Sequence, residues 1–131
     1  MMKINIETIP HGDQRYPTVG DYWDDEAGVV QVRVSDMKDW RYEALVAVHE
    51  LVEMFLTKHR DIAEPCISEF DIKFEQSREQ ALLTGEPGDH PNAPYRREHF
   101  FATNLERLLS AELGVDWFEY DRDVDALGIK K

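Results

Sequence analysis

A histidine and two glutamates lie within five consecutive residues, His49-Glu50-Leu51-Val52-Glu53. On an α-helix, side chains four residues apart lie on the same face, so His49 and Glu53 can offer two ligands to one metal ion. A glutamate directly after the histidine, here Glu50, can reach a metal-bound water and act as a general base. The spacing therefore predicts a divalent metal that activates water for hydrolysis, provided that a helix carries these residues.

The surrounding residues predict such a helix and indicate that it is central to the fold. Asp39 can cap a helix that begins at Trp40, and residues 58–60 place basic side chains at its end. Apolar residues occupy most of the remaining positions: Leu45, Ala47, Val48, Leu51, Val52, Met54, Phe55 and Leu56. A helix that is apolar on almost every side is normally buried. Because buried ionisable groups are costly without partners, the histidine and glutamates must be paired, hydrogen-bonded or bound to a metal.

The HELVE segment resembles the HExxH helix of the zincin metallopeptidases, and a β-ribbon followed by a long helix is similar to their minimal layout. The resemblance covers about the first half of the chain. It implies that His49 and Glu53 are metal ligands, that Glu50 is the general base and that a peptide or amide bond is the substrate. Glu53 stands where the family has its second histidine. Zinc is the favoured metal, and the additional oxygen ligand also suits manganese or iron.

A catalytic zinc site needs a third protein ligand, which must come from another segment. A helix is predicted from about Tyr95 to Leu113, and on it His99 borders the apolar arc while Glu98 points into it. Histidine is the more usual ligand, so His99 is the preferred candidate and Glu98 its rival. Asp71, on a preceding predicted helix, is a further rival as a ligand or as an acceptor that orients a histidine.

The order of the predicted elements is strands first and helices after. Residues 3–9 alternate as a strand, and residues 21–35 predict a β-hairpin. Helical spacing recurs from Pro65 to Ala81, and the tail from Asp116 to Leu127 predicts one more short helix. We therefore predict a single α+β domain spanning residues 1–131, in which a small, mostly antiparallel β-sheet or hairpin is followed by three main α-helices.

The composition narrows the classes of partner and the setting. With 15 Lys and Arg against 27 Asp and Glu, the net charge of −12 repels nucleic acid and anionic lipid and attracts cations. No segment approaches the roughly 18 apolar residues of a membrane span. A single cysteine, Cys66, excludes an intramolecular disulfide and a thiolate zinc framework. We expect a cytoplasmic protein, monomeric or a small homo-oligomer, without nucleic-acid or membrane partners and with an unknown substrate or protein partner.

Two hypotheses about function follow from these patterns. The first is a zincin-like hydrolase whose divalent metal is held by His49, Glu53 and His99, with Glu50 as general base. The second is a non-enzymatic acidic interaction protein, similar in size to phage or mobile-element accessory proteins, with a buried His/Glu hydrogen-bond cluster. Metal content distinguishes the two, because only the first requires a bound ion.

Overall fold

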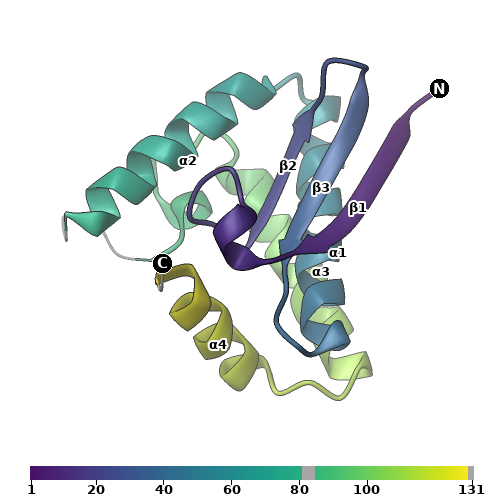
Figure 1. Cartoon of the computed structure of the whole chain (residues 1–131), viewed down its shortest axis with the longest axis vertical. Coiled ribbons are helices and arrows are strands. Elements are labelled where there is room, and N and C mark those ends of the chain that lie inside the picture. Colours follow the sequence, from purple (N-terminus) through teal and green to yellow (C-terminus); the bar gives the residue numbers. More distant parts are fainter. Residues whose placement is uncertain (81–84, 130–131) are drawn as a thin grey trace.

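The structure of the protein, a computed structural model, describes residues 1–80 and 85–129. Three strands precede four helices along the chain (Figure 1), which confirms the predicted α+β class. The elements are β1 (Lys3–Ile9), β2 (Gly20–Asp24), β3 (Val29–Ser35), α1 (Trp40–His59), α2 (Glu64–Glu79), α3 (Arg96–Glu112) and α4 (Trp117–Ile129), with short 3-10 turns at His11–Asp13 and Pro87–Asp89.

The strands form one sheet in the order β1-β3-β2. β2 and β3 make the predicted antiparallel hairpin, whose turn is held by the Asp25 side chain, which accepts the backbone N–H groups of Ala27 and Val29. β1 pairs with β3 in parallel, so the sheet is mixed rather than mostly antiparallel. β3 lies in the centre of the sheet, with β1 at one edge and β2 at the other, and its residues Val30, Val32 and Val34 are buried in the core. Alternation within β1 shows that one face is buried, but it does not specify the neighbouring strand.

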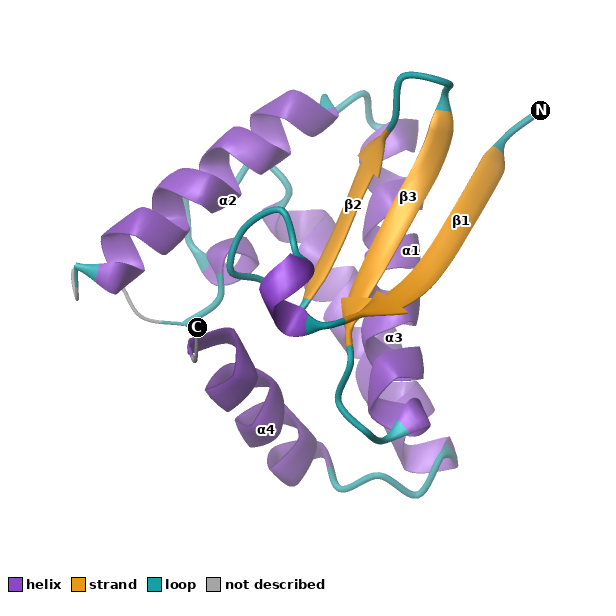
Figure 2. Ribbon diagram, in the orientation of Figure 1, coloured by secondary structure: helices purple, strands orange, loops and turns teal. Residues whose placement is uncertain are grey.

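Helix α1 is central, as its apolar sequence predicts. It packs against β2 and β3 on one side and against α3 on another, and Figure 2 shows it running behind the sheet with α3 beyond it. The Asp39 carboxylate caps its first turn by accepting the backbone N–H of Arg41 at 2.9 Å. Leu45 and Val46 of this helix are buried against the valines of β3 in the main hydrophobic core.

Helices α2 and α4 lie on the β2 side of the molecule. Figure 1 shows α2 and α4 beyond β2, on the side of the sheet away from β1. Helix α2 has Pro65 in its first turn and ends at Glu79, and the predicted extension to Ala81 lies outside the described residues. The predicted helix in the tail is present as α4, which adds a fourth helix to the three main ones. Within the described chain, no helix is both long enough and apolar enough to cross a membrane.

Candidate metal centre

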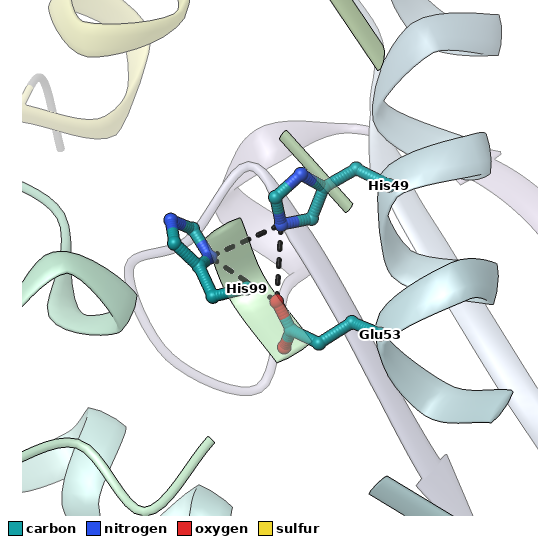
Figure 3. A group of neighbouring side chains, drawn as sticks. All are labelled: His49, Glu53 and His99. Carbon is teal, nitrogen blue, oxygen red and sulfur yellow. Dashed lines mark hydrogen bonds and ion pairs between the residues drawn. The ribbon is translucent and has the colours of Figure 1, made fainter. Parts of the chain in front are cut away.

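Three predicted ligands converge between α1 and α3, and we call His49, Glu53 and His99 the His–Glu–His cluster (Figure 3). Nε2 of His49 lies 3.0 Å from Oε2 of Glu53, and Nδ1 of His99 lies 3.2 Å from the same oxygen. The two histidine nitrogens are 3.2 Å apart. All three side chains are buried. The cluster therefore offers two nitrogens and one carboxylate oxygen at the corners of a nearly equilateral triangle.

The size of this triangle matches the coordination of a small divalent cation. Zinc binds imidazole nitrogen and carboxylate oxygen at about 2.0–2.2 Å, so a tetrahedral arrangement places two ligand atoms roughly 3.3 Å apart. The distances of 3.0, 3.2 and 3.2 Å are close to that separation. An ion about 1 Å from the plane of the three atoms would contact all of them. Three protein ligands are also the set that catalytic zinc sites use.

The outer nitrogen of His49 is oriented by a carboxylate. Nδ1 of His49 lies 2.7 Å from Oε1 of Glu106, and the hydroxyl of Tyr120 donates to Oε2 of the same glutamate at 2.5 Å. A proton on Nδ1 that is donated to Glu106 leaves the Nε2 lone pair directed at the centre of the cluster. Metal-binding histidines are usually held in this way by a carboxylate on their second nitrogen.

The outer nitrogen of His99 also faces carboxylates. Nε2 of His99 lies 3.2 Å from Oδ1 of Asp89 and 3.3 Å from Oε2 of Glu86, both in or next to the 3-10 turn that covers the ring. Each buried histidine therefore turns one nitrogen toward Glu53 and the other toward an acidic side chain. The repeated arrangement is typical of imidazole ligands.

Glu50, the predicted general base, lies beside the cluster and lines the same cavity. Burial raises the pKa of its carboxyl well above the usual value, and the negative charge of Glu53 adds to the effect. No hydrogen bond to this carboxylate occurs among the residues that the structure describes. A β-carbon at position 20 would overlap Oε1 of Glu50 and the side chain of Val46, so glycine there lets β2 approach α1 closely. The position suits a group that binds water next to a metal ion.

The two rival ligands lie outside the cluster. Oε2 of Glu98 is 2.5 Å from Nη1 of Arg60. Consecutive residues of a helix point about 100° apart, so Glu98 and His99 cannot both face α1 at the same depth. Asp71 lines the cavity from α2, where its carboxylate accepts the hydroxyls of Tyr16 and Tyr95. Neither carboxylate belongs to the group of converging atoms.

Sequence reasoning missed the groups that orient the histidines. Glu106 follows His99 by seven residues, two helical turns along the same face of α3, and that spacing was a usable signal. Tyr120 comes from α4, and Glu86 and Asp89 come from a loop. No spacing rule connects these three residues to a histidine of α1 or α3, because their positions depend on how the segments pack.

A cavity of about 120 Å³ lies beside the cluster. His49, Glu50, Glu53 and His99 line one side of it, and α2 and the segment before β2 contribute other walls. The candidate ligands and the candidate base thus face a common space that can admit a small group of a substrate.

Hydrogen bonding in the cluster governs its protonation in the metal-free protein. Burial opposes a charge on His49, but the hydrogen bonds to Glu106 and Glu53 outweigh it and raise its pKa well above the usual value. Burial also opposes a charge on His99, but Asp89, Glu53 and Glu86 raise its pKa to about 12. Burial would raise the pKa of Glu53, but the hydrogen bonds from both histidines lower it to about 2.

Zinc uptake at neutral pH is therefore expected to release about two protons, one from each histidine, since a protonated nitrogen cannot coordinate a metal. Neutral pH lies below the pKa of about 12 of His99, so its proton must leave first, and zinc affinity should rise as the pH rises. Isothermal titration calorimetry in buffers of different ionisation enthalpy measures the protons released. Uptake with no proton release would contradict this charge assignment.

Gly88 is expected to be required for the position of the His99 ring. A β-carbon at residue 88 would overlap the ring carbon Cγ and Nδ1 of His99. Gly88→Ala should lower zinc affinity about tenfold, comparable to the loss of an orienting group, and destabilise the fold by about 1–3 kcal/mol through overpacking. Zinc titration and thermal unfolding measure the two effects. Gly12→Ala is the matched control, because nothing lies within 4 Å of a β-carbon added there; equal zinc affinity in both variants would contradict the packing argument.

Comparison of the chain with protein-family models gave no match, and neither did comparison with curated proteins or with solved structures. The likeness to zincins therefore stays a resemblance of the HELVE helix and its preceding β-ribbon.

Proposed function

We propose that the protein binds one divalent metal ion through Nε2 of His49, Oε2 of Glu53 and Nδ1 of His99, and that it is a zincin-like hydrolase. One observation carries the proposal. Two buried histidines each direct one nitrogen at a shared glutamate oxygen and the other at a carboxylate. Zinc fits the ligand set best, and manganese or iron fits it as an alternative.

In the proposed hydrolysis, the residues around the cluster have different roles. A bound divalent ion supplies Lewis acidity, which polarises a carbonyl oxygen and lowers the pKa of water. Glu50 accepts the proton of the attacking water and can return it to the leaving group, because its carboxylate faces the cavity beside the ligands. Glu106, held by Tyr120, keeps the His49 ring in the orientation that ligation requires. A peptide or amide bond is the proposed substrate from the resemblance of HELVE to the zincin helix.

A specific observation also favours the second hypothesis, a metal-free acidic interaction protein. Oε2 of Glu53 lies within hydrogen-bonding distance of both histidines, so the two nitrogens that face the centre of the cluster have a partner without an ion. With both rings protonated, the surrounding carboxylates balance their charge. Under either hypothesis the acidic surface and the single cysteine suit a cytoplasmic protein, monomeric or a small homo-oligomer.

Elemental analysis of protein purified without a histidine tag tests the proposal directly, with an expected content of about one metal per chain. Adding zinc to the metal-free protein should raise the midpoint of thermal unfolding, since a ligand at about 1,000 times its Kd stabilises the native state by roughly 4 kcal/mol. A metal-free chain whose unfolding midpoint is unchanged by zinc, manganese and iron(II) would support the hydrogen-bonded cluster instead.

A further inference from the structure

Besides the candidate metal ligands, a second group of polar residues lines the cavity. It consists of Tyr16, Asp71 and Tyr95, and we call it the Asp71 wall. The hydroxyl of Tyr16 donates to Oδ2 of Asp71 at 3.0 Å, and the hydroxyl of Tyr95 donates to Oδ1. Tyr16 precedes β2, Asp71 lies on α2 and Tyr95 immediately precedes α3. Three separate segments thus hold one carboxylate in a defined position.

Asp71 differs in its partners from Asp21, Glu53, Glu75 and Glu106, the other deeply buried acids of the cavity. Its side chain is only 8% exposed, yet within the described chain it has hydrogen bonds from neutral phenols and no cationic partner. These four acids each have a cationic or titratable partner: Asp21 has Arg15, Glu75 has Arg78, and Glu53 and Glu106 have His49. Glu50, on the side of the cavity that carries the cluster, has no hydrogen bond among the described residues, but unlike Asp71 it is not held in place by two tyrosines. A buried carboxylate without a counter-charge is costly, and burial accordingly raises the pKa of Asp71 to about 7. The wall therefore lacks a positive charge that a ligand could supply.

The rest of the wall is suited to a cationic group. Each oxygen of Asp71 accepts one phenol and retains a lone pair for a further donor. Tyr16 and Tyr95 also line the cavity, and aromatic residues attract ammonium groups. A volume of about 120 Å³ is slightly below that of a roughly 150 Å³ cavity that holds benzene, so about five heavy atoms fit. An alkylammonium chain of the length of a lysine side chain has that size.

We infer that the Asp71 wall binds a primary ammonium group of the substrate. The reaction at the other side of the cavity rests on the proposed function, but the binding of the ammonium group does not. An anionic group is disfavoured next to Asp71 and Glu50, because both acidic side chains line the same space. The ammonium group belongs either to a lysine side chain or to an α-amino terminus, and both present the same chemistry to Asp71.

Calorimetric titration of the zinc-treated protein with three small probes tests the inference. N-acetyl-lysine amide carries only a side-chain ammonium, norleucine amide carries only an α-ammonium, and N-acetyl-norleucine amide carries neither. At least one ammonium probe is expected to bind at least about tenfold more tightly than the neutral probe, since a buried carboxylate strongly favours a charged partner. The stronger of the two identifies the source of the ammonium group. Equal binding of all three probes, or no binding of any, would overturn the inference.

Asp71→Asn should remove the preference for ammonium while leaving metal content unchanged, because Asp71 is not a ligand. Glu69→Gln is the matched control on the same helix, where Glu69 is exposed and paired with Lys73. The probe series is repeated on metal-free wild-type protein, so the inference does not depend on the folding of a variant. If the protein prefers the ammonium probes but binds no metal, the inference about the Asp71 wall would be supported and the proposed hydrolase function contradicted. If the protein binds metal but shows no preference for ammonium, only the inference that the Asp71 wall binds an ammonium group would be contradicted.

Discussion

Alanine in place of His99 is expected to lower zinc affinity by more than about a hundredfold, because loss of an orienting group alone typically costs 10–100-fold. Among the described residues, His99 is the one member of the His–Glu–His cluster that comes from outside α1, so the variant leaves His49 and Glu53 with an incomplete site. Competition with a chromophoric chelator measures the affinity. His59→Ala, at the last residue of α1 and exposed, is the control and should bind zinc like the wild type.

The outcome also decides between the candidate third ligands. Loss of zinc in His99→Ala with retention in Glu98→Gln and Asp71→Asn would support His99 as the third ligand beside His49 and Glu53. Unchanged uptake in His99→Ala would transfer the third position to Glu98, after release from Arg60, or to Asp71. The unfolding midpoint should be measured alongside, so that a folding defect is separated from the loss of a ligand.

Glu50→Gln is expected to retain metal and to lower the rate of hydrolysis by about 10²–10⁴-fold, the usual contribution of a general base. Glutamine keeps the shape of the side chain but cannot accept the proton of water. Hydrolysis of a peptide mixture in ¹⁸O-labelled water is followed by mass spectrometry, because each cleaved peptide bond gives an amine and a new carboxyl group that carries the label. Glu112→Gln, exposed at the end of α3, serves as the control. If Glu50→Gln incorporates ¹⁸O at the rate of the wild type, another residue must act as the base.

Local sequence was sufficient to predict the helix that carries the site. The cap at Asp39 and the apolar surroundings predict α1, and helical periodicity then places His49 and Glu53 on one face with Glu50 beside them. The alternating valines likewise predict the hairpin of β2 and β3, because a short turn joins strands that are adjacent in sequence. These features depend on contacts between residues a few positions apart.

Contacts between distant segments could be anticipated only in part. The residue type of His99 and its place beside the apolar arc of α3 predict it as a candidate ligand, and the structure brings it next to His49, 50 residues away in sequence. The pairing of β1 with β3 was not predicted, because alternation specifies a buried face but not the adjacent strand. The seven-residue spacing of Glu106 from His99 indicates that both lie on one face of α3, whereas no sequence pattern indicates that Tyr120 lies near the cluster.

By itself, then, the sequence determined that His49, Glu50 and Glu53, two candidate ligands and a candidate base, lie close together on one helix, since an α-helix has a known period. The tertiary structure alone decided which nitrogen of each histidine faces Glu53, because that choice is made by Glu106 on α3 and by Asp89 in the covering turn. It also decided that Asp71 is held by two tyrosines across a shared cavity rather than bound into the cluster. Both outcomes follow from how α1, α2 and α3 pack, and packing depends on side-chain shape over the whole core rather than on any local pattern.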